Sequence, residues 1–356
     1  MWSRPDPPAS GDTTDTTPTA PPKPHLTTGK KIVFAVLTVV LALIVAEGLC
    51  RLAGLGKRVQ IAGNISDWHN TPEGRTFWVP RGPGYNTNGM RDREHPERKP
   101  PGTFRIVCLG DSVTVGHTLK RSQSYPTIFE HYLRQLGLTA DVMNVAVSGW
   151  STQQEAAAYR HIARRYQPDH VFLGFCLNDV AEMRNNLTRP PSASARFMVR
   201  HSAMVRWLVD AEGRQISDVR QLFTEPDSQA VRDGWRRVFE ELAVLKDWTR
   251  ADGCRLSVVI FPFRFQLVDD STEPLAQQTL FQFCRRNAIP CLDLLPALKT
   301  MGADAFIDQS HLSFEGAGLV AEELVRWGRT GCTMCGYDLA DVDADVCPRC
   351  GEPIKK

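Results

Sequence analysis

The stretch RIVCLGDSVTVG, residues 105–116, decides the fold of this chain. The apolar run 106–109 is typical of a buried strand, and Gly110-Asp111-Ser112 follows it as a tight turn. In an open α/β sheet, ligands bind beyond the carboxyl ends of the strands. A serine at that edge is a candidate nucleophile. We therefore expect the rest of the chain to supply a base, a group that orients the base, and donors for an oxyanion.

Short apolar runs alternate with amphipathic segments from residue 104 onward. The expected strands are 104–109, 141–147, 170–175, 255–261 and 290–294, and the expected helices are 124–136, 152–166, 230–250, 274–287 and 313–326. Strands that alternate with helices predict a parallel sheet covered by helices on both faces. Residues 180–228 break the alternation, with a loop-like part at 185–191 and a short helix expected within 197–209. This insertion is either a lid or wall over the active edge, or an inert excursion.

Composition sets few limits on function. With 42% hydrophobic and 23% charged residues among 356, the chain resembles an ordinary globular protein with room for one large domain and appendages. The net charge of +2 says nothing about partners. No nucleic-acid partner is expected.

The N-terminal region predicts a membrane anchor. Residues 1–29 are rich in Pro and Thr and are expected to be disordered. The run IVFAVLTVVLALIVAEGL, residues 32–49, contains one charged residue, Glu47, and is long enough to cross a bilayer. We assign a single transmembrane helix to residues 30–51. A buried soluble helix and a cleaved signal peptide are the alternatives, but the leader is long and no small-x-small cleavage site follows. Basic residues flank both ends, so the flanks give no orientation.

Residues 52–103 read as a polar connector rich in Gly and Pro. Within it, Asn88-Gly89 is expected at the tip of a turn. Arg91 follows that turn, and it is either a surface residue or a side chain that reaches the active face. The domain with the alternating pattern then extends over residues 104–328.

Four short features fall at strand ends or at the start of a helix, and together they predict a serine hydrolase site. Ser112 follows the first strand, Gly149 the second and Asn178 the third, while Asp308 and His311 precede the last helix. His311 is the candidate base and Asp308 the group that orients it. The N–H groups of Ser112 and Gly149 and the side-chain amide of Asn178 are the candidate oxyanion donors. Each feature alone is a common turn or loop, and it is their joint order that indicates catalysis.

These blocks, Gly110-Asp111-Ser112-Val113-Thr114, Gly149, Asn178-Asp179 and Asp308-Gln309-Ser310-His311, resemble those of the SGNH (GDSL-type) hydrolase family. The resemblance covers residues 104–328. It implies a flavodoxin-like three-layer α/β/α fold and ester hydrolysis through an acyl-enzyme, with no cofactor needed for catalysis. One position departs from the pattern, because Cys176 stands where the family usually has glycine. The larger side chain is expected to narrow the acyl pocket or to shift Asn178.

The last residues, 329–356, predict a separate metal module. Two Cys-x-x-Cys pairs, each followed by glycine, are typical of a tetrahedral four-thiolate site, and the segment resembles a zinc ribbon; the pairs are Cys332 with Cys335 and Cys347 with Cys350. Zinc is favoured over iron or two disulfides. The acidic residues 341, 343 and 345 between the pairs are interpreted as a solvated loop. A protein partner of this module is left open.

The sequence therefore predicts a membrane-anchored serine esterase that hydrolyses carboxylic esters, including acetyl esters on glycans or lipid esters. Acetyl transfer to a cell-envelope glycan is a first alternative. A catalytically silent scaffold that works through the zinc ribbon is a second. Reduced thiolates favour the cytoplasm and an envelope substrate favours the outside. Because zinc protects thiolates, the hydrolase domain is expected on the extracytoplasmic side.

Overall fold

The computed structural model describes residues 27–55, 66–184, 192, 194, 197, 198, 201–208, 211–269, 271–340 and 344–354. The predictions for residues 1–26, 56–65, 185–191, 341 and 343 lie outside these residues. The chain divides into two compact units, Met1–Gly54 and Leu55–Lys356, and each is described by itself.

In the first unit, almost all of the described residues belong to one helix. Helix α1, Thr28–Leu52, has 25 residues and a mean hydropathy of 2.7 over its most apolar window. Apolar side chains occur on every face and are exposed, from Ile32 to Leu49. A helix of this length and composition is able to cross a bilayer.

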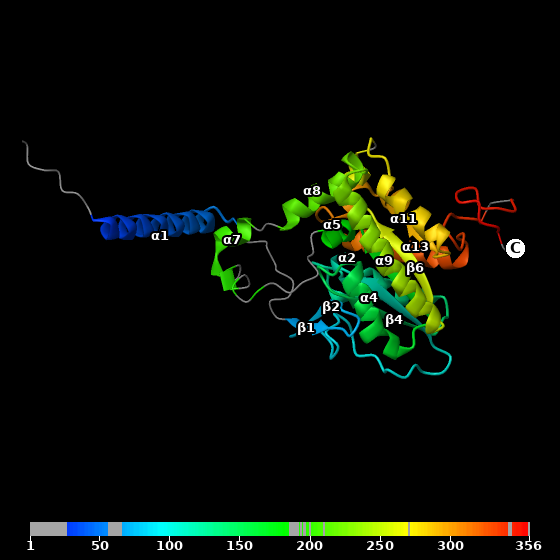
Figure 1. Cartoon of the computed structure of the whole chain (residues 1–356). Helices are drawn as coiled ribbons and strands as arrows, with labels where there is room; N and C mark the ends of the chain where they lie inside the picture. The colour runs from blue at the N-terminus through cyan, green and yellow to red at the C-terminus, as the bar shows by residue number, and fades with distance from the viewer. Residues whose placement is uncertain are drawn as a thin grey trace, which may run out of the picture. The chain divides into compact units, whose positions relative to one another are not determined.

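The second unit is built on a five-stranded parallel sheet with the order β4-β3-β5-β6-β7 (Figure 1). The strands are β3 (Phe104–Gly110), β4 (Ala140–Ala146), β5 (His170–Cys176), β6 (Arg255–Phe261) and β7 (Cys291–Asp293). All five coincide with predicted strands, and the order is that of a flavodoxin-like fold. The chain enters the sheet at β3, next to its centre, so the strand that precedes Ser112 is flanked on both sides.

Helices cover both faces of the sheet and form the outer layers. The first four are α2 (Ser112–Val115), α3 (Tyr125–Gln135), α4 (Thr152–His161) and α5 (Asn178–Arg184). The next four are α7 (Ala203–Leu208), α8 (Ala211–Thr224), α9 (Gln229–Ala251) and α10 (Arg264–Val268). The last three are α11 (Leu275–Arg286), α12 (Leu295–Lys299) and α13 (Phe314–Arg329). Short 3-10 turns occur at Arg121–Gln123, Ala163–Tyr166 and Gly302–Ala305. Helices α3 and α13 pack together on one face, and α4, α5 and α9 on the other.

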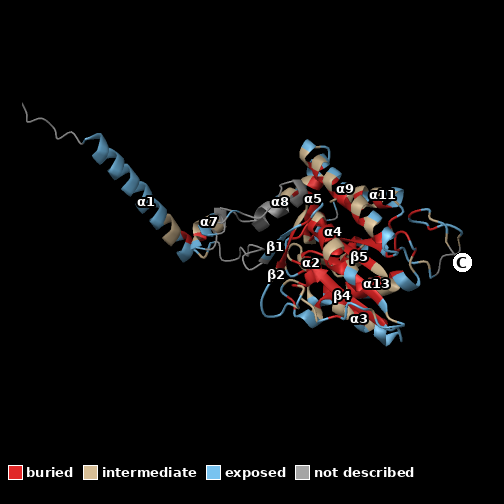
Figure 2. Cartoon of the chain, turned by 60° about the horizontal axis from the view of Figure 1, so that its bottom comes forward, coloured by how far each residue is buried: buried red, intermediate tan, exposed pale blue. Residues whose placement is uncertain are grey.

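Buried residues concentrate in the sheet between these layers (Figure 2). The sheet is buried because its strands carry apolar side chains on both faces, as strand β5 shows. Phe172 contacts Trp327 of α13, whereas Phe175 stacks on Trp235 of α9. Strands buried on both faces carry continuous apolar runs, which is why the pattern was readable from the sequence.

Two predicted segments differ in detail from the structure. The helix expected at 152–166 ends at His161 and continues as a 3-10 turn, before Gln167 takes a left-handed φ of 53°. Among the described residues of the insertion 180–228 are helices α7 and α8, and α7 lies within the segment where a short helix is expected.

The segment that was interpreted as a polar connector contains a packed hairpin. Strands β1 (Ser66–Asn70) and β2 (Thr76–Pro80) pair antiparallel. Phe77, Trp78 and Val79 of β2, together with Met90, are buried in the same core as the parallel sheet. Two aromatic rings and two aliphatic side chains anchor this part of the chain, although most of the residues around them are polar.

A buried ionic network ties residues 92–95 to the sheet. His95, with 1% of its side chain exposed, lies 2.8 Å from Asp141 and 3.0 Å from Asp92. Arg93 contacts Glu130 and Asp141 at 2.7 and 2.6 Å. Burial lowers the pKa of His95, but hydrogen bonds to the two aspartates outweigh it, so the net pKa is raised.

Candidate active site

Ser112 begins a one-turn helix that sits directly on the sheet. Asp111 caps this helix by accepting a hydrogen bond from the N–H of Val113 at 2.9 Å. The close seating depends on two glycines, because a Cβ on Gly110 or Gly174 would lie 2.2 or 2.4 Å from the hydroxyl of Thr114. The Gly-Asp-Ser-x-Thr pattern therefore fixes where the serine stands relative to strands β3 and β5.

The structure brings Ser112, His311 and Asp308 into one hydrogen-bonded chain. Nε2 of His311 lies 2.9 Å from Oγ of Ser112, and Nδ1 lies 2.7 Å from Oδ2 of Asp308. The other carboxylate oxygen of Asp308 accepts the main-chain N–H groups of Ser310 and His311 at 3.0 and 2.9 Å. The loop 308–311 thus holds both its carboxylate and its imidazole in place before α13 begins.

The surroundings of Asp308 keep it ionised. Burial raises the pKa of this carboxyl. The hydrogen bonds from His311 and from the two main-chain N–H groups lower the pKa by more than burial raises it, so the net value is about 2. At neutral pH the group is a carboxylate that faces the imidazole. Such an arrangement fixes the orientation of the ring and stabilises an imidazolium when one forms.

Gly149 and Asn178 follow β4 and β5 at the same edge as Ser112. Gly149 has a φ of 82°, which favours glycine, and it is exposed. Asn178 is buried, and its side-chain amide donates to Oδ2 of Asp111 at a long 3.4 Å. Asp179 accepts a hydrogen bond from the hydroxyl of Thr152 at 2.7 Å, which joins the end of β5 to the start of α4 just after Gly149.

Two side chains brace this edge: Trp150, whose role the sequence did not indicate, and Arg91, for which contact with the active face was one of two alternatives. The indole N–H of buried Trp150 donates to the main-chain oxygen of Trp78 at 2.9 Å, so the hairpin holds the turn that carries Gly149. Arg91, for which a surface role was one alternative, donates to the main-chain oxygens of Val115, Gly116 and Leu119, two of them at 3.2 and 2.8 Å. It therefore supports the back of the helix that begins with Ser112.

His117 is a further residue at this site, and its role was not evident from the sequence. Its ring centroid lies 4.8 Å from that of His311, with the two planes tilted by 42°. Burial lowers the pKa of His117, and the nearby positive groups His311 and Arg91 lower it further, while Asp308 raises it. Its position five residues after Ser112 was the available signal, since the turn that follows a nucleophile stays close to it.

Cys176, the departure noted in the sequence, is the last residue of β5 and is 1% exposed. It is a buried residue beneath the edge and not an exposed thiol. None of the ten cysteines forms a disulfide, and all ten are buried.

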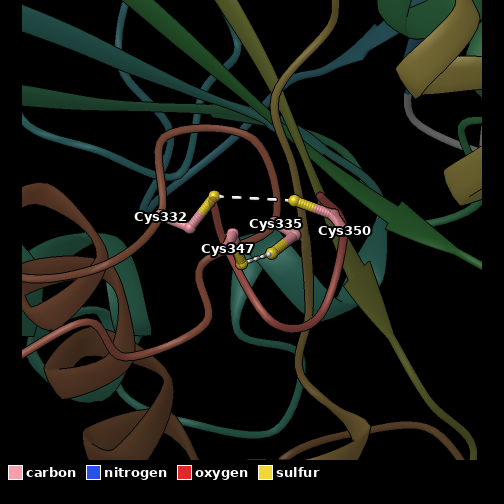
Figure 3. Close-up of side chains that lie close together, drawn as sticks. All are labelled: Cys332, Cys335, Cys347 and Cys350. Carbon is pink, nitrogen blue, oxygen red and sulfur yellow. Dashed lines mark hydrogen bonds between the residues drawn. The ribbon is translucent and has the colours of Figure 1, made fainter. Parts of the chain in front are cut away.

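The four C-terminal cysteines form a compact cluster. Their sulfur atoms all lie within 4.8 Å of one another, and Cys332–Cys350 and Cys335–Cys347 are each separated by 3.6 Å (Figure 3). A disulfide would need about 2.05 Å. Four thiolates at about 2.3 Å from one tetrahedral ion would be separated by about 3.8 Å. The cluster therefore has the size of a metal site.

The turns of the cluster suit thiolate ligands. Gly336 and Gly351 follow the second cysteine of each pair and both have a φ of 71°. Burial raises the pKa of Cys347, but main-chain N–H groups of Cys350 and Arg349 outweigh it, so its pKa is lowered, whereas burial raises the pKa of Cys335 and of Cys350. N–H groups aimed at sulfur in this way stabilise a thiolate, which is the form that binds a metal.

The cysteine cluster is docked on the sheet and on α13. The N–H of Cys291 in β7 donates to the main-chain oxygen of Met334 at 2.6 Å. Trp327 of α13 donates its indole N–H to the oxygen of Cys332 at 2.9 Å. Arg349 lies 3.4 Å from the carboxylate of Asp293, which is partly buried at the end of β7. Both cysteine pairs thus contact the edge strand.

Comparisons with known proteins give one matching family and several solved structures to which the chain is similar. The model of the GDSL-like lipase/acylhydrolase family matches residues 108–317, which contain Ser112, Gly149, Asn178, Asp308 and His311. Among solved structures, the acetyl xylan esterase AlAXEase is 14% identical with a TM-score of 0.43, covering 62% of this chain and 98% of that chain. A catalytic mutant of Axe2, an acetylxylan esterase from Geobacillus stearothermophilus, is 14% identical with a TM-score of 0.42, covering 63% and 93%. TesA is 13% identical with a TM-score of 0.41, covering 61% and 94%. No curated protein matches the chain.

Proposed function

Because the chain belongs to the GDSL-like lipase/acylhydrolase family and is a serine ester hydrolase, we propose that Ser112 is its nucleophile, His311 its general base and Asp308 the carboxylate that orients the base. The hydrogen-bonded chain at 2.9 and 2.7 Å is the single observation that carries this assignment. A serine hydroxyl needs a base within hydrogen-bonding reach, and His311 is at that distance.

The proposed reaction has two steps. Oγ of Ser112 attacks the ester carbonyl, its proton passes to Nε2 of His311, and the carbon–oxygen bond breaks as that proton is delivered to the leaving alcohol. Water then attacks the acyl-enzyme, with His311 again taking and returning a proton, and the free acid leaves. The N–H groups of Ser112 and Gly149 and the amide of Asn178 are proposed to stabilise the oxyanion in both steps.

A fluorophosphonate probe tests the nucleophile directly. We expect labelling of the wild-type chain at Ser112, no labelling of Ser112→Ala, and unchanged labelling of Ser271→Ala, which replaces an exposed serine. The Ser112→Ala variant should also lose hydrolysis of p-nitrophenyl acetate, by about 10⁴-fold or more. A folded wild-type chain that neither labels nor hydrolyses esters would refute the assignment and would favour a silent scaffold.

The proposed substrates are carboxylic esters, with acetyl esters on glycans and lipid esters as the two classes to separate. A panel of acetylated oligosaccharides and of short- and long-chain acyl esters, each compared with Ser112→Ala, identifies the class. Adding an unacetylated sugar acceptor distinguishes hydrolysis from transfer, because a hydrolase releases free acid whereas a transferase forms a new sugar ester.

Helix α1 is proposed to anchor the chain in a membrane with the hydrolase domain on the extracytoplasmic side. Its length and apolar surface support a span. The burial of every cysteine is compatible with an oxidising compartment, since buried thiols exchange slowly. In intact cells, protease added outside should degrade the hydrolase domain. Complete protection in intact cells, lost on lysis, would place the domain inside.

The four-cysteine cluster is proposed to bind zinc as a structural ion. A set of four sulfur ligands and the spacing of the atoms support tetrahedral coordination. Elemental analysis of the purified chain should find a single zinc ion, which Cys335→Ser loses and Cys254→Ser, a buried cysteine outside the cluster, retains. Iron in the wild type, or a mass that shows two disulfides, would contradict the proposal.

A further inference from the structure

The residues after α2 form a constrained turn that faces His311. Gly116 takes a left-handed φ of 70°, and the N–H of His117 donates back to the oxygen of Ser112 at 3.0 Å. This is the pattern of a Schellman cap, which fixes the residue after the glycine relative to the start of the helix. His117 is therefore held by the same one-turn helix that carries the nucleophile.

The turn is held from outside as well. Thr118 has a φ of 70°, an unusual value for a β-branched residue, so the surrounding structure must stabilise it. Arg91 does this by donating to the main-chain oxygens of Val115, Gly116 and Leu119, on both sides of the strained residue. The imidazole of His117 is thus presented to His311 by a main chain that is fixed at both ends.

We propose that His117 is a positioning residue for His311: its ring covers one face of the His311 imidazole, keeps that ring turned between Ser112 and Asp308, and limits the access of water to it. The inference rests on the proposed function of Ser112 and His311. The contact between the two rings, with centroids 4.8 Å apart, is what carries it.

The charge state of His117 supports this role. The groups that face it are His311, Asp308 and Arg91. Burial, His311 and Arg91 lower the pKa of His117 and Asp308 raises it, with a net lowering. The ring is therefore neutral at neutral pH, and it can lie against His311 without repelling the imidazolium that forms during the reaction.

Three substitutions of His117 distinguish the effect of the ring's shape from the effect of its nitrogen atoms. In His117→Ala, the His311 ring gains rotational freedom and contact with water, which stabilises its protonated form. We expect kcat for p-nitrophenyl acetate to fall roughly 5- to 50-fold with KM nearly unchanged. The acid limb, which is the fall of kcat/KM at low pH as the base is protonated, should move to higher pH by roughly 0.5 to 1 unit. His117→Phe keeps a ring of similar shape and should retain kcat within about twofold. His117→Gln, without a ring, should behave like His117→Ala.

The rate of fluorophosphonate labelling at each pH measures the same effect without a chosen substrate. A matched control is His131→Ala, which removes an exposed histidine on α3 and should change neither the acid limb nor the labelling rate. Arg91→Met should shift the acid limb in the same direction as His117→Ala. The double variant should show little further change, because both act through one turn.

Several results would overturn the inference. A folded His117→Ala with the rate and acid limb of the wild type would do so, as would a His117→Phe that loses as much as His117→Ala. Equal hydrolysis by Ser112→Ala and the wild type would instead refute the proposed function itself. If His117→Ala fails to fold, the comparison of His117→Phe with His117→Gln still decides, since equal rates in these two would exclude ring packing.

Discussion

Trp150 donates its indole N–H to the main-chain oxygen of Trp78 at 2.9 Å, and this bond joins the β1–β2 hairpin to the turn that carries Gly149. The hairpin precedes the first strand of the parallel sheet, yet it supports a candidate oxyanion donor that follows the second. The hairpin within the segment between the predicted anchor and the sheet is therefore a support of the candidate active site.

Trp150→Phe should weaken both stability and catalysis. The substitution leaves the buried oxygen of Trp78 without its donor, which costs about 1–3 kcal/mol in the free energy of unfolding. We also expect a lower kcat, because Gly149 is no longer held. Trp68→Phe is the control, since Nε1 of Trp68 has no hydrogen-bond partner in the described part of the chain. Urea titration and ester hydrolysis measure the two effects, and equal losses in both variants would contradict the role of the bond.

Asp308→Asn should lower kcat by about 10³- to 10⁴-fold, because an amide cannot stabilise the imidazolium. The pKa of Asp308 is lowered to about 2, below the ordinary value of 3.8. Its ionised form therefore contributes stability at pH values above the ordinary pKa, and that contribution is lost as pH falls toward 2. The unfolding free energies of wild type and Asp308→Asn should converge over this acid range. Asp304→Asn, at an exposed position nearby, should show no such convergence.

The contribution of His95 to the free energy of unfolding should have the opposite pH dependence. Its pKa is raised by Asp141 and Asp92, so the stabilisation is fully present below the ordinary value of 6.5 and is lost as pH rises through the raised pKa. The stability advantage of wild type over His95→Gln should therefore shrink from pH 6 toward pH 9. His131→Gln, at an exposed position on α3, serves as the reference. A difference that grows with pH would show that His95 is held neutral.

Gly174→Ala should displace the one-turn helix that carries Ser112. The added Cβ would lie 2.4 Å from the hydroxyl of Thr114, which is β-branched and cannot easily turn away. We expect a loss of about 1–3 kcal/mol in stability, with a fall in kcat. In Gly318→Ala the new Cβ meets nothing within 4 Å. Because it lies in a helix, this control should gain about 0.5–1 kcal/mol. Unchanged kcat in Gly174→Ala would show that the helix tolerates the shift.

The parts of the site that could be predicted share a physical cause. Strands buried on both faces are continuously apolar, so their ends could be located, and Ser112, Gly149 and Asn178 follow those ends. His311 and Asp308 were identifiable because a nucleophilic serine needs such partners. The roles of Trp150 and Arg91 could not be predicted, because their acceptors are main-chain oxygens, which every residue has. The contact of His117 with His311 likewise depends on tertiary structure, since 194 positions separate them in the numbering.

The docking of the cysteine cluster on β7 has a consequence for aggregation. An edge strand with free main-chain groups is a template on which another chain can add. The described residues 332–340 and 344–350 contact that edge, through the bond from the N–H of Cys291 to the oxygen of Met334 and the pair of Arg349 with Asp293. Removing the cluster would expose the main-chain groups of this edge strand and leave the partly buried carboxylate of Asp293 without Arg349. We therefore expect a shortened chain that ends after α13 to aggregate more readily. In the full chain, the segment with the C-terminal cysteines covers the exposed edge strand of the sheet.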